Sequence, residues 1–151
     1  MSGPRSQPPA VRAHDAYTPE SALDACVALT RHHSSTFYLG SRMFGREKRT
    51  AVSAVYAMCR TGDDAVDEAL GFDDARRRLA DWWAGVERAY AGRPDPTSAT
   101  EVGLRWVLDR YDVPMGAFAE LREGFESDLT LRCVATTDEL LLYSRRVAGV
   151  V

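Results

Sequence analysis

Apolar residues recur at a helical spacing through most of this chain, and that spacing constrains the fold more than any other feature. The clearest case begins near residue 46, where four apolar positions fall at i, i+3, i+4 and i+7: Val52, Val55, Tyr56 and Cys59. Residues at this spacing share one face of an α-helix. No segment shows sustained alternation of apolar and polar residues, which is the pattern of a half-buried strand. The sequence therefore predicts an all-α fold.

About six helices are expected from this spacing and from residues typical of helix ends. Thr18 and Pro19 suit an N-cap and a first helical position, so the first helix should begin there and end at about His32. Residues 33–44 then interrupt the helical pattern. The second helix follows this interruption and should end near Gly71.

The remaining helices are separated by residues that break or cap a helix. The third should be capped by Asp73 or Asp74 and end near Tyr90, before a loop at 92–96 that is rich in glycine and proline. The others are expected at about 100–111, from Pro114 to about 129, and from Thr136, where Thr136 and Glu139 match a capping box. Five aromatic residues at helical spacing are expected in the core: Trp82, Trp83, Trp106, Phe118 and Phe125.

Length and composition limit the classes of partner. The chain has 151 residues, of which 45% are hydrophobic, so it can form one domain with a core. Its net charge of −3 predicts no nucleic-acid partner. Three cysteines without a Cys-x-x-Cys pair indicate reduced thiols in a cytoplasmic protein, and no apolar run is long enough for a membrane span. Residues 1–17, rich in proline, are expected to be a disordered leader to the 18–151 domain.

An acidic stripe follows the apolar face of the second helix. Four residues occupy i, i+3, i+4 and i+7 on it: Arg60, Asp63, Asp64 and Asp67. Asp63 and Asp67 repel each other unless a cation lies between them. Mg²⁺ typically binds one or two carboxylates together with phosphate oxygens. The stripe therefore favours a magnesium site for a diphosphate, although an acidic surface or a helix terminus would give the same motif.

The segments around this stripe resemble a known family. Residues 33–38 read HSSTFY, residues 47–49 read EKR, and residues 56–68 read YAMCRTGDDAVDE. In this order, and without a gap from His33 to Glu68, they are similar to the first motifs of the squalene/phytoene synthase family. The similarity returns at 124–129, 137–140 and 143–149, and so covers about residues 20–151.

This resemblance implies a helical bundle of the isoprenoid synthase type and a magnesium-dependent prenyl transfer. The family joins two prenyl diphosphates, such as farnesyl or geranylgeranyl diphosphate, head to head through a cyclopropylcarbinyl diphosphate to a phytoene- or squalene-like product. By resemblance, Asp63 and Asp67 would be catalytic ligands of Mg²⁺, with Asp64 as a supporting metal residue. Arg60, also catalytic, would bind the diphosphate.

The resemblance also assigns substrate-binding residues to the HSSTFY segment. His33 and Ser34 would lie beside the diphosphate, and Phe37 and Tyr38 would line a prenyl tunnel. Thr36, which replaces the usual serine but keeps its hydroxyl, would also bind substrate. His33 could equally be a histidine at a helix C-terminus, where the helix dipole favours it.

Other positions depart from the family pattern. Phe44 and Gly45 replace the usual Leu-Pro, and Arg145 replaces a tyrosine near the reacting centre. The family's second aspartate-rich motif has no match between Leu70 and Val151. We therefore expect the N-terminal half of a synthase domain, an incomplete bundle that is inactive alone.

Several expectations follow from an incomplete bundle. The helix face that carries Val52 and Val55 should lie uncovered, and a C-terminal chain could complement it. Separately, the cysteine pattern predicts a cytoplasmic protein, and the family resemblance implies that it could be peripheral to a membrane.

Two alternatives remain open on the sequence alone. The chain could be a non-catalytic helical remnant or an interaction module. It could also be a head-to-tail prenyl diphosphate synthase, because Asp63, Asp64 and Asp67 match that motif too, but the HSSTFY segment and the run from Tyr56 to Arg60 argue against this.

Overall fold

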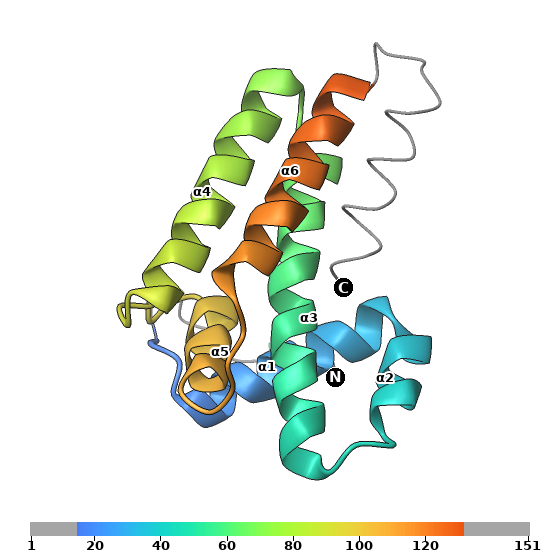
Figure 1. Cartoon of the computed structure of the whole chain (residues 1–151), viewed down its shortest axis with the longest axis vertical. Coiled ribbons are helices and arrows are strands. Elements are labelled where there is room, and N and C mark those ends of the chain that lie inside the picture. The colour runs from blue at the N-terminus through green and yellow to red at the C-terminus, as the bar shows by residue number, and fades with distance from the viewer. Residues whose placement is uncertain (1–14, 132–151) are drawn as a thin grey trace, which may run out of the picture.

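The computed structural model describes residues 15–131, which form six helices and no strand (Figure 1). The helices are α1 (Pro19–His33), α2 (Ser35–Ser41), α3 (Arg46–Asp67), α4 (Phe72–Tyr90), α5 (Ala99–Leu108) and α6 (Met115–Leu131). The predicted all-α fold is thus confirmed. The helix expected from Thr136 lies outside the described residues, as does most of the expected leader.

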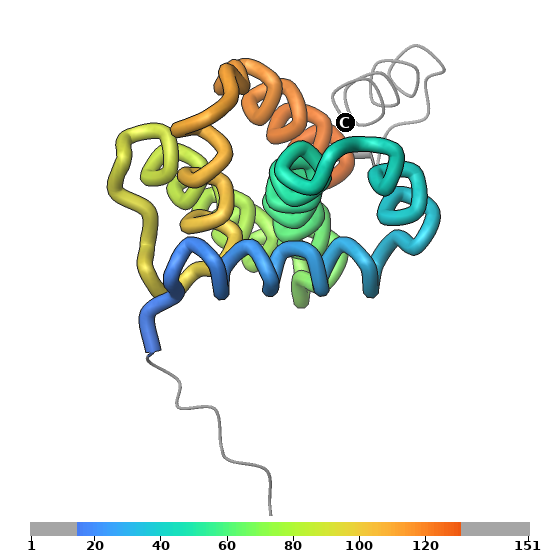
Figure 2. Tube along the Cα trace, turned by 90° about the horizontal axis from the view of Figure 1, so that it is seen from below, coloured from blue at the N-terminus to red at the C-terminus, as the bar shows by residue number. Residues whose placement is uncertain are grey.

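α3 is the central helix of the bundle, because it contacts each of the other five. α4 and α6 run alongside it and contact each other (Figure 1). α1 crosses beneath one end of this layer, where it packs against α3 and α5 (Figure 2). Among the described residues, no helix is both long enough and apolar enough to span a membrane.

The start of α1 agrees with the sequence prediction. The Thr18 hydroxyl accepts a hydrogen bond from the backbone N–H of Ser21 (3.2 Å), and the Ser21 hydroxyl accepts one from the backbone N–H of Thr18 (3.0 Å). This reciprocal capping box satisfies donors that no helical carbonyl can reach, and Pro19 fills the first helical position.

The interruption predicted at residues 33–44 is wrong, because most of it forms α2. Ser34 ends α1 and also starts α2, where its hydroxyl accepts a hydrogen bond from the backbone N–H of Phe37 (3.2 Å). Serine is a poor residue inside a helix but a strong N-cap. The serines that suggested a break therefore mark the start of a new, short helix.

The cap predicted for α4 is also wrong. Gly71, with φ of 137°, is the N-cap, whereas Asp73 and Asp74 lie in the first turn of the helix. The Asp74 carboxylate accepts a hydrogen bond from the backbone N–H of Leu70 (3.0 Å) and pairs with Arg78 (2.9 Å). A side chain would be strained at this φ, so glycine at position 71 determines where α4 begins.

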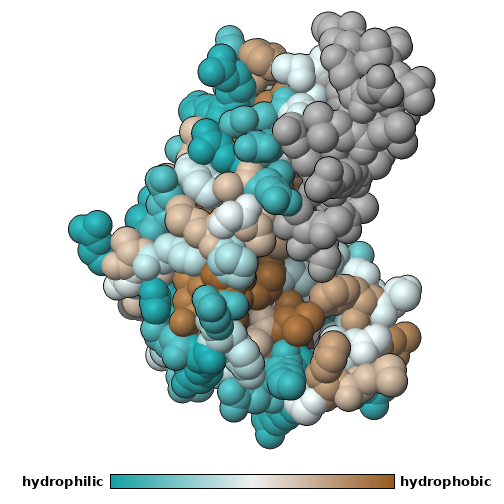
Figure 3. Space-filling model, viewed as in Figure 1, coloured by the Kyte–Doolittle hydropathy of each residue, from teal (hydrophilic) through white to brown (hydrophobic). Residues whose placement is uncertain are grey.

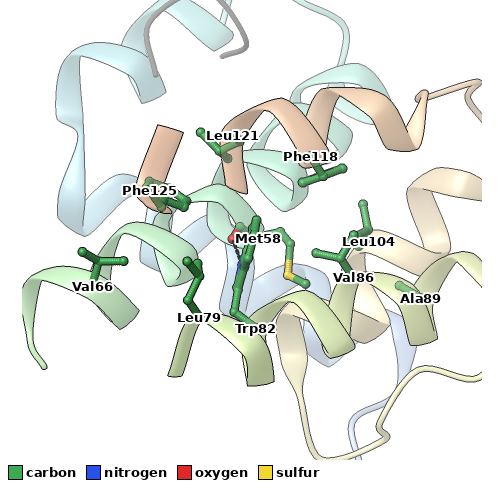
Figure 4. Close-up of a cluster of buried hydrophobic side chains, with 10 residues drawn as sticks. All are labelled: Met58, Val66, Leu79, Trp82, Val86, Ala89, Leu104, Phe118, Leu121 and Phe125. Atoms are coloured by element: carbon green, nitrogen blue, oxygen red, sulfur yellow. Dashed lines mark hydrogen bonds between the residues drawn. The ribbon is translucent and has the colours of Figure 1, made fainter. Parts of the chain in front are cut away.

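The main core lies between α3, α4 and α6, with a contribution from α5 (Figure 4). Its buried members are Met58, Val66, Leu79, Trp82, Val86, Ala89, Leu104, Phe118, Leu121 and Phe125. The indole N–H of Trp82 donates to the backbone carbonyl of Met58 (2.9 Å). The one polar atom of this large core side chain therefore has a hydrogen-bond partner. Of the five aromatic residues expected in the core, Trp82, Phe118 and Phe125 are buried, but Trp83 and Trp106 are only half-buried.

A buried carboxylate joins α4, α5 and the loop between them. Glu101 accepts hydrogen bonds from Arg88 (Nη2–Oε1 2.6 Å, Nε–Oε2 3.0 Å) and from the backbone N–H of Asp95 (2.8 Å). Its charge is therefore paired and hydrogen-bonded, which is the condition under which a buried carboxylate is tolerated. The loop that contains Asp95 is fixed in place as a result.

Gly62 lets α3 approach α4 and α6 closely, and we predict that alanine there destabilises the protein. A Cβ at this position would lie 2.7 Å from Trp82 Cε2 and 2.8 Å from Phe125 Cε2. Overpacking of this kind costs about 1–3 kcal/mol. That cost should exceed the gain of about 0.5–1 kcal/mol that alanine brings to a helix interior. Urea denaturation should therefore show a lower free energy of unfolding for Gly62→Ala.

Gly116→Ala on α6 is the matched control, because nothing lies within 4 Å of a Cβ there. Its free energy of unfolding should equal or slightly exceed that of the wild type. Equal effects of the two substitutions would mean that the approach at Gly62 is not close.

Candidate functional site

The acidic stripe lies in the last two turns of α3, which ends at Asp67. The side chains of Arg60, Asp63 and Asp64 are 32%, 39% and 23% exposed, and Asp67 is exposed. The stripe is thus half-buried at its start and open at its end. Helical geometry alone places all four residues on one side of α3, as the sequence predicts.

Arg60 is held by two of the carboxylates. Its Nη1 lies 3.4 Å from Asp63 Oδ2, and its Nε lies 3.0 Å from Asp64 Oδ1. The second contact is an ion pair whose direction does not suit a hydrogen bond, so the buried Nε has no hydrogen-bond acceptor among the described residues. Neither ion pair extends to Asp67.

The environment of Asp63 disfavours its charge. Burial raises the pKa of Asp63 above its ordinary value, and the neighbouring charge of Asp67 raises it further. Arg60 lowers this pKa, whereas Asp64 and Asp128 add smaller increases. Asp128 comes from α6, so negative charge from two helices meets at Asp63. The sequence gives no indication that Asp128 faces Asp63, because the crossing of α3 and α6 brings them together.

The residues present can supply part of a magnesium site. Among the described residues, no three histidine, cysteine or acidic side chains converge as a complete ligand set. Asp63 and Asp67 nevertheless lie one turn apart, with a repulsion that a cation would relieve. Because Mg²⁺ usually takes one or two carboxylates and completes its shell with phosphate oxygens and water, this pair fits a metal that arrives with a diphosphate.

The structure brings only part of the HSSTFY segment to α3. Phe37 stacks on Tyr56 of α3, with ring centroids 4.6 Å apart and an interplanar angle of 27°. Tyr56 lies one turn before Arg60, so this contact places α2 beside the approach to the stripe. Tyr38 instead lies under the guanidinium of Arg31, 5.3 Å from its ring centroid.

The polar residues of the same segment are placed differently. His33 is the last residue of α1, is exposed, and packs edge-on against His32. The Ser34 hydroxyl caps α2, and Thr36 is exposed. Within the part of the chain that the structure describes, no hydrogen bond or ion pair joins these three residues to the stripe. Their predicted contact with a diphosphate stays a prediction.

An apolar groove of about 390 Å³ lies beside the stripe, along the face of α3 that carries Val52 and Val55. We call it the α3 groove; its walls are Phe37, Phe44, Lys48, Ala51, Val52, Val55, Tyr56, Cys59, Val107, Tyr111 and Val113. Apolar surface gathers in this lower half of the molecule (Figure 3). Cys59, next to Arg60 in sequence, keeps a neutral thiol at the wall, because burial raises its pKa to about 12.

The far wall of the α3 groove is a feature that the sequence analysis missed. Val107 belongs to α5, and Tyr111 and Val113 lie in the segment that follows it. In the sequence, the spacing of Val107, Tyr111 and Val113 indicates only the end of a helix and does not show that they face α3. The face of α3 that was expected to be uncovered is thus a half-buried groove wall.

The sign of the Asp63 pKa change predicts how the stripe affects stability. An acid whose pKa is raised by folding contributes stability that is present below its unfolded pKa of about 3.8 and is lost as pH rises through the folded pKa. At neutral pH the ionised Asp63 should therefore destabilise the metal-free protein. Asp63→Asn should raise the thermal midpoint at neutral pH, and this advantage should vanish at pH values below 3.8.

Asp74→Asn is a control of opposite sign. The pKa of Asp74 is lowered, chiefly by the backbone N–H of Leu70 and then by Arg78 and Arg77, so its contribution is present above the unfolded pKa and is lost on acidification. This variant should melt below the wild type at neutral pH. Calorimetry of the two variants and the wild type across pH, with a chelator present, would measure these thermal midpoints. A midpoint for Asp63→Asn below that of the wild type at neutral pH would contradict the assigned charge repulsion.

Known proteins resemble this chain in sequence and in fold. The family model of squalene/phytoene synthase matches residues 30–151. A phytoene synthase of Thermus thermophilus is 50% identical over 127 residues, which are 84% of this chain and 42% of that protein. A 15-cis-phytoene synthase of Synechococcus elongatus is 33% identical over 130 residues, 86% of this chain and 42% of that protein.

A solved structure gives the same fold. The crystal structure of a dehydrosqualene synthase superposes with a TM-score of 0.75 at 24% identity, over 87% of this chain and 45% of that one. The chain spans less than half the length of these relatives. The predicted bundle of the isoprenoid synthase type is confirmed, and the chain belongs to the squalene/phytoene synthase family.

Proposed function

We propose that this protein serves the head-to-head condensation of two prenyl diphosphates. The observation that carries the proposal is the position of the stripe at one end of the α3 groove, where Cys59 and Tyr56 of the groove wall adjoin Arg60. A prenyl diphosphate has the same two parts, a dianionic or trianionic head and an apolar tail. The names of the relatives favour geranylgeranyl diphosphate and a phytoene-type product over farnesyl diphosphate and a squalene-type one.

The stripe would act on the diphosphate. Asp63 and Asp67 would hold Mg²⁺, and Asp64 would support them while it orients Arg60. When bound, Mg²⁺ supplies a Lewis acid that stabilises charge on the departing diphosphate. Arg60 can present guanidinium N–H groups to phosphate oxygens from its two terminal nitrogens, whereas its Nε is buried against Asp64.

The α3 groove would hold the prenyl tail and keep water from the carbocation that diphosphate departure leaves. Phe37 and Tyr56 stack at the end of the groove nearest Arg60, so their two rings would flank a reacting carbon bound there. An apolar wall excludes water, which would otherwise capture a carbocation. His33, Ser34 and Thr36 remain candidates for the outer side of the diphosphate.

The whole reaction needs more than the stripe and the groove. Two diphosphates require a larger concentration of cations than one aspartate motif can hold, and these 151 residues carry one such motif. We therefore propose that this chain binds one prenyl diphosphate and turns over only with a complementing C-terminal segment. Arg145, at the position of the family's tyrosine, lies outside the described residues. A cytoplasmic or membrane-peripheral location stays a prediction.

Magnesium-dependent binding is the direct test of the stripe. Isothermal titration of a non-hydrolysable prenyl thiodiphosphate should show affinity that depends on Mg²⁺. The double variant Asp63→Asn/Asp67→Asn should bind about tenfold more weakly or worse, because the metal loses both protein carboxylates. It should also lose the difference between titrations with and without Mg²⁺.

Glu68→Gln is the matched control, since it removes an adjacent carboxylate that is not on the stripe. This variant should bind as the wild type does. If Asp63→Asn/Asp67→Asn and the wild type bind alike in the presence of Mg²⁺, the stripe is not a metal site and the proposal fails.

A further inference from the structure

A second groove lies between the start of α1 and α5, and all its described lining residues differ from those of the α3 groove. We call it the α1–α5 groove; its volume is about 400 Å³. Its apolar lining comes from α1, from the loop after α4 and from α5: Pro19, Pro94, Val102 and Trp106. Val102 and Trp106 lie one turn apart on α5 and are half-buried, so part of each side chain stays open to a ligand.

The charged side chains of the α1–α5 groove differ in their partners. Arg105 donates to Asp109 (Nε–Oδ1 3.0 Å), and Arg110 stacks on the Trp106 ring, 4.1 Å from its centroid. Among the described residues, Glu20 of α1 has neither an ion pair nor a hydrogen bond from its side chain. The edge of the groove on α1 therefore presents a negative charge that is available to a cationic ligand.

The described part of the chain begins at the edge of this groove. The backbone N–H of Tyr17 donates to the carbonyl of Pro96 (2.7 Å), and Pro94 of the groove wall precedes Pro96 by two residues. Figure 2 shows the start of α1 beside the segment that leads from α4 to α5. Residues 1–14 are therefore joined to the fold next to the groove.

Residues 1–14 have the composition of a ligand for such a groove. They contain the pair Pro8-Pro9, which favours a polyproline II conformation, and they carry Arg5 and Arg12 but no acidic residue. Polyproline II segments bind grooves lined by aromatic side chains, and an arginine of this segment matches the free charge of Glu20. Such a segment needs no core of its own, so the composition that predicts a disordered leader also suits a docking segment.

The covalent connection favours this segment over other occupants. Arg12 lies three residues before Asp15, the first described residue, so an extended chain places it up to about 10 Å away. A ligand tethered this closely has an effective concentration of about a millimolar or more. A free peptide, or the same segment of a second copy in dilute solution, has no such advantage.

We propose that residues 8–12 of this chain dock in the α1–α5 groove. The two prolines would lie against the exposed part of Trp106, and Arg12 would pair with Glu20. A segment docked there would hold α1 and α5 together from outside. Because α5 also supplies Val107 to the far wall of the α3 groove, the docked segment would support that wall. The proposal does not require the protein to transfer prenyl groups.

Limited trypsin digestion of the full 151-residue chain tests the proposal. Trypsin cleaves after arginine, and cleavage of a docked segment requires the segment to leave the groove first. The bond between Arg12 and Ala13 should therefore be cut about tenfold more slowly in the wild type than in a free peptide of residues 6–18. Mass spectrometry of early time points would follow this one bond.

Two variants remove the docking from its two sides. Trp106→Ala shortens the groove wall, and Pro8→Gly/Pro9→Gly removes the polyproline II preference without changing a described residue. Each should bring the cleavage rate to that of a free peptide of the same sequence. Trp83→Ala is the matched control, because Trp83 is also half-buried and lies under Arg122, 5.1 Å from its ring centroid, but on α4 outside the groove. This variant should be cut as slowly as the wild type.

Equal cleavage rates for the wild type and the free peptide would overturn the proposal, and so would equal rates for the wild type and Pro8→Gly/Pro9→Gly. Protection that grows with protein concentration, together with self-association in sedimentation velocity, would assign the groove to the segment of a second copy instead. Circular dichroism melts would show whether each tryptophan variant keeps its fold. If Trp106→Ala does not, the double glycine variant still decides the matter.

Discussion

The close approach of α3 to α4 and α6 at Gly62 is the constraint on which the candidate site depends. Two aromatic rings, of Trp82 and Phe125, occupy the space that a side chain at position 62 would need. Trp82 also donates its indole N–H to the Met58 carbonyl, one turn earlier on α3. α3 is thus fixed in rotation about its own axis, and this rotation brings Asp63 toward Asp128 of α6 while Val52 and Val55 line the groove.

The stripe shows a conflict between folding and binding. Folding half-buries Asp63 beside Asp67 and brings Asp128 toward it, although like charges and burial both disfavour the ionised form. Arg60 relieves only part of this cost, because it also pairs with Asp64. A divalent cation would relieve the rest. Sites that bind charged ligands often have this property, in that the same carboxylates lower the stability of the empty protein.

Local signals predicted the parts of the structure that depend on neighbours in sequence. The cap at Thr18, the course of α3 and the order of the stripe all follow from helical spacing and from capping chemistry. α2 was missed because serine can either interrupt a helix or cap the start of one. Only the hydrogen bond from the backbone N–H of Phe37 to the Ser34 hydroxyl shows that it is a cap here. The N-cap at Gly71 was missed for a related reason, since aspartate is common both at the cap and in the first turn.

Features that join distant segments could not be predicted in this way. Glu101 looks like a surface residue in sequence, but it is buried because Arg88 and the backbone of Asp95 converge on it. The far wall of the groove, with Val107, and the approach of Asp128 both depend on how α5 and α6 cross α3. These crossings are set by packing between helices, which periodicity within one helix does not encode.

The central claim is that the stripe and the α3 groove hold two parts of one ligand. Val52→Trp should fill the groove and leave the stripe unchanged, because Val52 lies two turns before Arg60 on the groove face. Titrating this variant with Mg²⁺ and either pyrophosphate or a prenyl thiodiphosphate separates the two parts. The account predicts unchanged affinity for pyrophosphate and a loss of about tenfold for the prenyl ligand. Unchanged affinity for both ligands would contradict it.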